Sequence, residues 1–152
     1  MLENNLYDAN EHFLQPMACI QTSDFVIKNT NLHQQPKEKF YGNREYKRHL
    51  MLDGKKNIYA KQLQKRCTQL LFRIREGQGK AVYLIGVEDN GNTNGLLQDE
   101  CIQSIKNFMI ITENIGVKIN KMRIYKWQNN NEMRYCVIFK VTKVMDDIYC
   151  LI

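Results

Sequence analysis

Hydrophobic and polar residues follow a regular spacing from about residue 44 onward. Within residues 44–52, Tyr46, Leu50 and Leu52 can share one face of a strand. After Asp53 and Gly54 the apolar residues recur every three or four positions, which predicts an amphipathic helix. The apolar stripe of this helix, and the glycine expected to end it, are Leu63, Cys67, Leu70, Leu71, Ile74 and Gly77.

The middle of the chain combines a short apolar run, a turn and a second helix. Residues 81–87 are almost all apolar, as expected of a strand that is buried on both faces of a sheet. Asn90 and Gly91 predict a tight hairpin that returns residues 92–96 antiparallel to this strand. A helix is then predicted over residues 98–115, with Cys101, Ile105, Phe108, Met109 and Thr112 on one face and Gly116 as its stop.

Two longer strands are predicted further on. Residues 117–127 and 133–144 flank a polar tip, and in the second strand apolar residues alternate with Arg134 and Lys140. Residues 148–152 are expected to add an edge strand. The order βαββαββ, with two helices to cover one face of a mixed sheet, indicates an α+β two-layer sandwich.

The first forty residues have a different character. They contain both prolines of the chain and many Asn and Gln residues, and they sustain no period of 2 or 3.6. We therefore expect an extended N-terminal arm over residues 1–40, followed by a single α+β domain over residues 41–152. The arm is too apolar to stay in water throughout. It either wraps its own domain or lies along a partner, and the residues that require such cover are Phe13, Leu14, Met17, Ile20, Phe25, Val26 and Ile27.

Length and composition narrow the setting. A chain of 152 residues fits one domain with one core. No run approaches the roughly 18–20 apolar residues that span a bilayer, and the first residues lack the order of a signal peptide, so we expect a cytoplasmic protein with no membrane partner. The five cysteines are odd in number and scattered, which argues against a disulfide framework and against paired zinc ligands. We expect them to be reduced.

Basic residues are concentrated in one third of the chain. Residues 37–75 hold twelve of the twenty-two Lys and Arg residues and three acids, whereas residues 76–152 balance nine bases against nine acids. Because such a block repels itself unless a polyanion lies against it, we interpret it as an RNA-facing surface; an ordinary solvated basic face is the alternative. The candidate RNA-binding residues are Lys37, Lys39, Arg44, Lys47, Arg48, Lys55, Lys56, Lys61, Lys65, Arg66, Arg73 and Arg75.

Two details refine this interpretation. On the first predicted helix, Lys61 and Lys65 fall opposite the apolar stripe. A second row along the flank of the same helix suits phosphate contacts and consists of Gln62, Arg66, Gln69 and Arg73. Near the end of a predicted strand, Tyr125 and Trp127 can stack on bases, although packing in the core or at an edge is the commoner fate of such residues.

Motifs for catalysis or cofactor binding do not stand out. The three histidines are not spaced as a helical metal pair, no Gly-x-Ser-x-Gly elbow occurs, and no cysteine has a recognisable base partner. Residues 75–80 contain glycines and a lysine but precede a strand, which is the wrong context for a phosphate-binding P-loop. We therefore expect a protein that is not an enzyme and has no cofactor, no metal site and no small-molecule substrate.

Three acidic residues leave a catalytic alternative open. Glu45, Glu88 and Asp89 can in principle hold a divalent ion, and clustered carboxylates of this kind support phosphodiester cleavage. Acids beside an Asn-Gly turn are more often turn formers. A metal-dependent RNA endonuclease is therefore the alternative from another class of function.

A family resemblance adds to these patterns. Residues 75–91, with Gly95 and Leu96 just after and residues 45–47 well before, resemble the N-terminal domain of the GTP-binding protein one and two family. Members of this family are eukaryotic translational GTPases related to elongation factor Tu, and the resemblance spans roughly residues 45–144. The chain has no Gly-x-x-x-x-Gly-Lys-Ser/Thr motif and stops about where the first strand of a G domain would begin. We therefore do not expect GTP hydrolysis.

A second resemblance points to RNA as well. Residues 85–91, followed by Gly95 and Leu96, are similar to the AlbA-like domain of Schlafen proteins. That similarity implies an AlbA-like two-layer fold and an RNA-facing surface. Some members of that family cut tRNA and rRNA, but their spaced acidic cluster is not evident in this chain, so the resemblance implies RNA binding rather than cleavage.

The architecture also resembles the ribosome-bound dormancy factors of microsporidia. That resemblance implies a non-catalytic protein that contacts rRNA and ribosomal proteins, occupies a tRNA site with the E site favoured, and inhibits translation in hibernating ribosomes. Our leading hypothesis is such a ribosome-associated protein. The alternatives are the endonuclease and a regulatory module that docks on a translation factor through the exposed side of the hairpin at residues 117–144.

Overall fold

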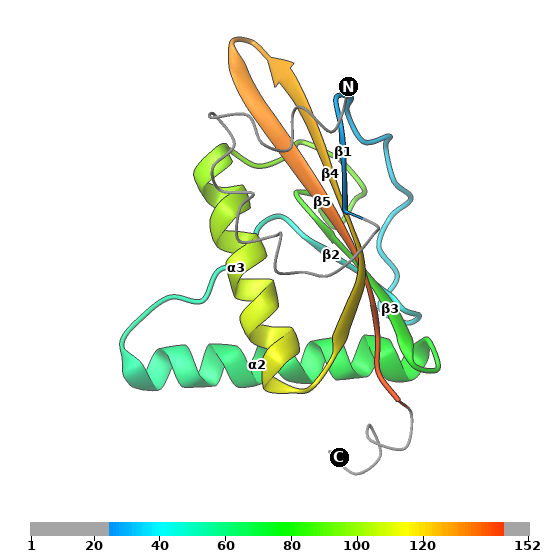
Figure 1. Cartoon of the computed structure of the whole chain (residues 1–152), viewed down its shortest axis with the longest axis vertical. Coiled ribbons are helices and arrows are strands. Elements are labelled where there is room, and N and C mark those ends of the chain that lie inside the picture. The colour runs from blue at the N-terminus through cyan, green and yellow to red at the C-terminus, as the bar shows by residue number, and fades with distance from the viewer. Residues whose placement is uncertain (1–24, 145–152) are drawn as a thin grey trace.

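The computed structural model describes residues 25–144, which form a five-stranded mixed sheet and two helices (Figure 1). The strand order across the sheet is β1-β4-β5-β3-β2. The outer pairs β1–β4 and β2–β3 are parallel, and the inner pairs are antiparallel. The predicted α+β class is confirmed. In chain order the elements are β1 (Phe25–Lys28), β2 (Arg44–Lys47), α2 (Lys56–Glu76), β3 (Lys80–Ile85), α3 (Gln98–Asn114), β4 (Lys118–Asn129) and β5 (Glu132–Thr142).

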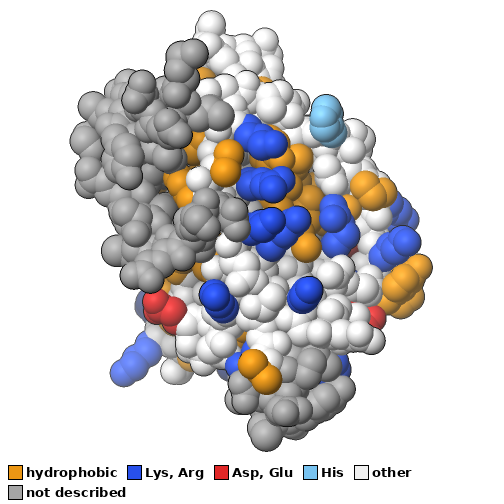
Figure 2. Space-filling view, turned by 45° about the vertical axis from the view of Figure 1, so that its right-hand side comes forward, with side chains coloured by type: hydrophobic (Ala, Val, Ile, Leu, Met, Phe, Trp, Pro, Cys, Tyr) orange, Lys and Arg blue, Asp and Glu red, His pale blue; other side chains and the backbone are white. Residues whose placement is uncertain are grey.

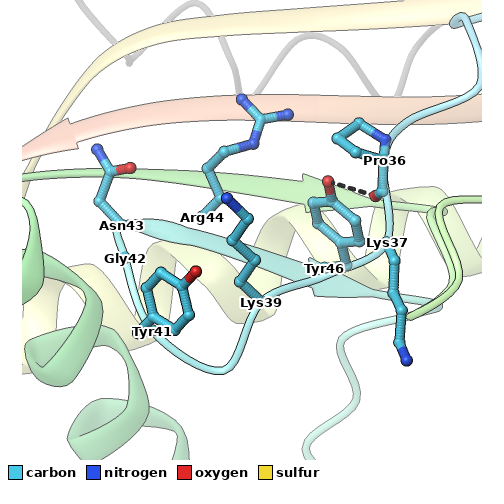
Figure 3. Close-up of a pocket in the computed structure, with 8 residues that line it drawn as sticks. All are labelled: Pro36, Lys37, Lys39, Tyr41, Gly42, Asn43, Arg44 and Tyr46. Carbon is cyan, nitrogen blue, oxygen red and sulfur yellow. Dashed lines mark hydrogen bonds between the residues drawn. The ribbon is translucent and has the colours of Figure 1, made fainter.

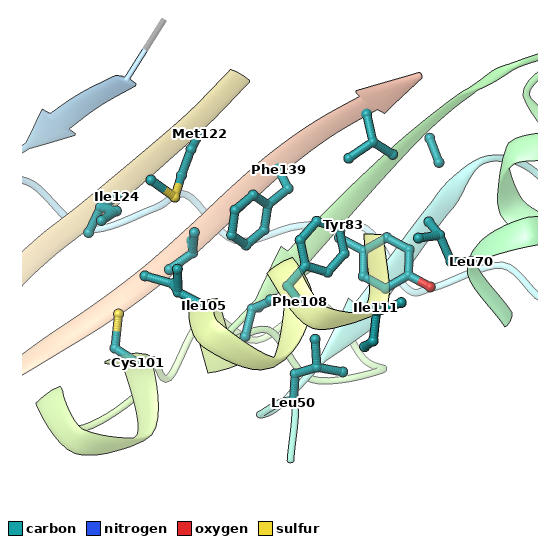
Figure 4. Close-up of a cluster of buried hydrophobic side chains, with 14 of the residues drawn as sticks. Leu50, Leu70, Tyr83, Cys101, Ile105, Phe108, Ile111, Met122, Ile124 and Phe139 are labelled. Carbon is teal, nitrogen blue, oxygen red and sulfur yellow. The ribbon is translucent and has the colours of Figure 1, made fainter. Parts of the chain in front are cut away.

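Both helices pack on the same face of the sheet, and the main core lies between the two layers (Figure 4). At its centre, the ring of Phe108 from α3 stacks on Phe139 from β5 with 4.2 Å between centroids. The ring of Tyr83 from β3 lies 5.0 Å from Phe108 on the other side. Leu70 and Ile74 bring α2 into the same core, where both are fully buried.

The two predicted helices and the long hairpin are confirmed. Helix α2 ends where expected, because the amide of Gly77 donates to the carbonyl of Arg73 at 2.9 Å. Helix α3 begins with the Leu97 amide donating to the Glu100 carboxylate at 3.0 Å. Strands β4 and β5 are joined by Asn130 and Asn131, which both have positive φ angles. This is the two-residue geometry that matches the twist of a hairpin.

The strand predicted over residues 44–52 is shorter than expected. Strand β2 ends at Lys47, and the chain then crosses from the sheet to the helix layer. There the Leu50 amide donates to the hydroxyl of Ser104 at 3.0 Å, and its carbonyl accepts from the Asn107 side chain at 2.9 Å. These two polar side chains of α3 replace the strand partners of Leu50, so its side chain can be completely buried outside any strand.

The return strand predicted over residues 92–96 does not form. The turn is present, with the Gly91 amide donating to the Glu88 carbonyl at 2.8 Å, but both sides of β3 are occupied by β2 and β5. The chain instead passes the end of the sheet and makes one isolated bridge, between Leu96 and Tyr135. The predicted order is thus corrected to ββαβαββ.

The boundary of the predicted arm is also corrected. Residues 25–28 form β1, and Ile27 is buried against the core with 2% of its surface exposed. The following segment crosses the sheet face without helices, where it contributes Leu32 to a second, smaller core. It then meets the 88–92 turn so closely that a Cβ at Gly91 would lie 1.9 Å from the Gln35 carbonyl oxygen. From residue 25 on, the predicted arm therefore wraps its own domain.

Several predictions concern residues outside this range. Residues 1–24 and the edge strand at residues 148–152 lie outside the described residues, as do Cys19 and Cys150.

The three cysteines within the range, Cys67, Cys101 and Cys136, are free buried thiols, and burial raises the pKa of Cys136 to about 12. Neither α2 nor α3 has the length and hydrophobicity that a bilayer-spanning helix requires, within residues 25–144.

Candidate nucleic-acid interface

The twelve candidate RNA-binding residues do not form one surface. One group lies on the outer side of α2 or just before it, on the helix layer, and is exposed: Lys55, Lys56, Lys61, Lys65 and Arg75. A second group precedes or belongs to β2 at the edge of the sheet and is also exposed: Lys37, Lys39 and Arg44. Of the remaining four, Lys47 and Arg66 are partly buried, Arg73 is buried, and Arg48 is exposed just after β2.

The second group borders a cavity of about 280 Å³ (Figure 3). Lys39 and Arg44 reach over this cavity, whereas Lys37 points away from it. The Arg44 guanidinium donates to the Gln35 side chain at 2.9 Å. The cavity wall is fixed by the hydroxyl of Tyr46, which donates to the Pro36 carbonyl at 2.9 Å.

Arg73 is engaged within the domain and is not presented to a phosphate as the sequence prediction expected. Its side chain is 4% exposed, and its Nε donates to the carboxylate of Glu45 at 2.9 Å. The remaining nitrogens donate to backbone carbonyls of Lys39, Tyr41 and Gly42, at 2.9, 3.0 and 2.9 Å respectively. Arg73 therefore ties the loop before β2, and β2 itself, to α2.

The rest of the predicted row along α2 also faces the domain. Gln62 accepts from the Asp53 amide at 2.7 Å, and the Nε of Arg66 is buried without a hydrogen-bond partner in the described chain. Lys47 is half-buried at 3.6 Å from Glu45, and burial lowers its pKa. Arg48 is exposed and lies 3.9 Å from Glu88. Lys47 and Arg66 therefore offer less to an external phosphate than the exposed group on α2, whereas Arg48 stays accessible.

The carboxylates of the endonuclease alternative have separate roles. Glu45 is buried beside Arg73, whereas Glu88 follows β3 and lies near Arg48. Among residues 25–144 there is no group of three His, Cys, Asp or Glu side chains placed to hold a metal ion. Glu45, Glu88 and Asp89 thus do not assemble into a metal site in the described chain.

Glu38, which lies near Arg73 and Glu45, provides a pH-dependent test of the packing around β2. Burial raises its pKa from 4.5 to about 7, and Glu45 and Asp89 act in the same direction, while the Tyr46 amide and Arg73 oppose them. Folding therefore takes up a proton between these pH values, so this contribution to stability is complete below pH 4.5 and lost as pH rises through 7. In urea denaturation, we expect the wild type to lose about 1 kcal/mol more than Glu38→Gln between pH 5 and pH 8, after allowance for solvent screening. If the free energies of unfolding of the wild type and Glu38→Gln change with pH in parallel, the buried environment assigned to Glu38 is wrong.

The sheet face without helices carries cations that the charge count along the sequence does not reveal. Lys121 lies opposite Lys140, and Arg44 and Lys140 both lie opposite Val82. Lys80 is two residues from Val82 and Arg123 is two residues from Lys121, so strand alternation places all five cations on the same face. By the same register, Lys28 and Arg134 extend this face toward β1 and the hairpin tip. We call these seven residues the basic sheet face: Lys28, Arg44, Lys80, Lys121, Arg123, Arg134 and Lys140.

Few carboxylates neutralise this surface. Glu132 pairs with Arg134 at 2.8 Å and is the acid that the register places on the same face. Lys80, Lys121, Arg123 and Lys140 form no ion pair or hydrogen bond through their side chains within residues 25–144. Figure 2 shows a side of the molecule where Lys and Arg side chains gather around hydrophobic ones, with acidic side chains at its margins.

The lysines of this face are arranged unfavourably for the protein alone. Lys121 lies directly opposite Lys140 in the β4–β5 pair, and like charges in that position destabilise a sheet. Together with Lys80 they border a cavity of about 290 Å³ whose other polar side chains are Asn43, Asn120 and Thr142. A phosphate placed there would relieve the repulsion and receive several donors.

Comparison with known proteins finds sequence similarity over part of the chain. The chain is 34% identical to human (Homo sapiens) GTP-binding protein 2 over 110 residues, and 39% identical to the mouse (Mus musculus) protein over 88 residues. The chain is homologous to part of GTP-binding protein 2. The resemblance predicted from residues 75–96 is thus confirmed. No family model matches the chain.

The GTP-binding protein 2 alignments have a limited span. They include 72% and 58% of this chain but 17% and 14% of the human and mouse proteins. The chain therefore corresponds to a small fraction of the length of these relatives. GTP binding, which their name states, is a property of those proteins.

Proposed function

We propose that this chain is a non-catalytic, ribosome-associated protein of the cytoplasm that binds rRNA. It would inhibit translation in dormant ribosomes by occupying a tRNA site, with the E site as the preferred place. The observation that carries the proposal is the basic sheet face, where four cations without partners in the described chain surround a sheet surface. The homology with part of GTP-binding protein 2 supports a role connected with translation through the family resemblance described above.

Occupancy, rather than chemistry, is the proposed mechanism. The cations of the basic sheet face project from five paired strands, so their relative positions are set by backbone hydrogen bonds and a packed core. A rigid set of cations can bind phosphates at fixed spacing with little loss of conformational entropy. The exposed lysines of α2 and of the position just before it are proposed as a second, separate set of phosphate contacts: Lys55, Lys56, Lys61 and Lys65.

The proposal predicts a steep dependence of ribosome binding on salt. If six to eight cations contact phosphates, affinity should fall by about three orders of magnitude or more between 50 and 200 mM salt, because each contact releases counterions. Pelleting of the purified chain with isolated ribosomes over a salt series measures this slope. A shallow slope would contradict phosphate anchoring, and shortened rRNA recovered from the pellets would contradict a non-catalytic role.

A further inference from the structure

A cavity of about 300 Å³ opens at the hairpin end of the basic sheet face. Its wall combines three parts of the chain: the loop after β1, the segment before α3, and the ends of β4 and β5. The side chains that line it include one aromatic ring, one guanidinium and several amides. They are Asn31, Thr93, Asn94, Trp127, Asn129 and Arg134.

The aromatic wall of this cavity is held in place by a glycine. A Cβ at Gly95 would lie 2.7 Å from Cη2 and 3.0 Å from Cζ2 of Trp127, so the indole packs directly on the Gly95 backbone. Thr93 in the same segment is fixed as well, because its hydroxyl donates to the Leu32 carbonyl at 2.9 Å. The half-buried indole is therefore positioned before any ligand arrives.

Polar groups around the ring lack partners in the described chain. The side-chain amides of Asn31, Asn94 and Asn129 are exposed and make no hydrogen bond to another described residue. The Nε of Arg134 is buried and also unpartnered, although its Nη2 is held by Glu132 at 2.8 Å. An amide presents a donor and an acceptor side by side, which is the pattern found on the edges of nucleobases.

The cavity is continuous with the cations of the sheet. Along β4, the residues on this face are Lys121, Arg123, Tyr125 and Trp127, and alternate residues of a strand are about 6.6 Å apart. Lys28 lies over the Tyr125 ring, with Nζ 5.9 Å from its centroid. Two cations are thus followed by two aromatic rings along one strand. This order fits an extended nucleic-acid strand, which binds through phosphates and stacked bases.

We propose that this cavity binds an unpaired nucleobase of an RNA strand, with the indole of Trp127 as the stacking surface and the neighbouring amides on the base edge. The phosphates of the same strand would lie along Lys28, Arg123 and Lys121. This inference rests on the proposed RNA-binding function and adds the kind of RNA that is recognised. The bases of a duplex are stacked on each other, so a duplex would reach the cations but not the cavity.

Trp127 reports on its own site, because it is the one tryptophan in the sequence. Titration of the full chain with an unstructured ten-nucleotide RNA should quench its fluorescence. Inorganic polyphosphate of similar charge should bind, as seen by competition with a dye-labelled form of the same RNA, without comparable quenching. A duplex should behave like polyphosphate.

Variants separate stacking from charge. Trp127→Ala should weaken binding of the single strand about tenfold to a hundredfold and leave polyphosphate binding unchanged, whereas Trp127→Phe should retain most of the affinity. As the matched control, Lys140→Ala should weaken RNA and polyphosphate alike. If Trp127→Ala fails to fold, Asn94→Leu tests the base edge with the indole in place, and its single-strand affinity should fall while polyphosphate binding stays.

The outcomes distinguish the two proposals. Equal binding of single strand, duplex and polyphosphate, with no quenching by RNA, would overturn the base site while polyanion binding stands. Failure of both RNA and polyphosphate to bind would overturn the proposed function together with the base site. Quenching by the single strand that the Trp127 and Asn94 variants weaken selectively would support the base site.

Discussion

Replacing Arg73 with alanine is expected to lower the free energy of unfolding by about 3–5 kcal/mol. The change leaves the Glu45 carboxylate buried without its cation, and it removes donors from three backbone carbonyls in the loop before β2. Loss of one partner from a buried ion pair is costly because the other charge stays out of water. Urea denaturation followed by circular dichroism measures the change.

Arg75 supplies the matched control on the same helix. It is exposed, so Arg75→Ala should change stability by less than about 0.5 kcal/mol. A double variant, Arg73→Met with Glu45→Leu, should recover much of the loss, because apolar side chains can replace a buried pair. If Arg73→Ala is as stable as the wild type, the structural role assigned to Arg73 is wrong, and the sequence-based interpretation as a phosphate ligand becomes open again.

The second large effect is expected on binding. Combined replacement of Lys121, Arg123 and Lys140 by alanine should weaken the affinity for ribosomes about a hundredfold or more near 100 mM salt. The slope of log affinity against log salt should fall by about 2 to 3, because about one counterion is released per phosphate contact. The fold should persist, since the change removes like charges that face each other on β4 and β5. Pelleting with ribosomes over a salt series measures both quantities.

A triple variant of α2 is the matched control for this experiment. Lys56, Lys61 and Lys65 carry the same total charge and are exposed on the other layer. Their replacement by alanine should have a smaller effect on affinity. If the α2 variant loses binding and the sheet variant does not, then the interface lies on the helix layer, where the charge along the sequence first placed it.

The sequence predicted the regular elements that local pattern determines. Helices α2 and α3 and the β4–β5 hairpin follow from apolar spacing and from their turn residues. Strand β1 was missed because four residues without alternation carry little signal, and its partner β4 lies far along the chain. The strand at residues 92–96 was predicted from a turn motif, but β3 already pairs with β5 on one side and with β2 on the other.

The sequence predicted a basic surface, but it located only part of the residues that form the basic sheet face. Residues 76–152 are neutral in total, because acids in turns and on α3, such as Glu88, Asp99 and Glu113, cancel the cations of the strands. Only the pairing register separates these acids from the strand cations and places Lys121, Arg123 and their neighbours on one face. The alternation of Lys121, Arg123, Tyr125 and Trp127 was the signal available. It could not be interpreted without knowing which face the helices cover.

The central claim is that the chain associates with ribosomes through phosphate contacts. Sedimentation of native cell extract through sucrose gradients at low and high salt, with this chain followed by antibody, tests it most directly. We predict co-migration with monosomes at low salt that is lost at high salt. A chain that stays at the top of the gradient in both salts, or that remains on monosomes in both, would contradict the claim.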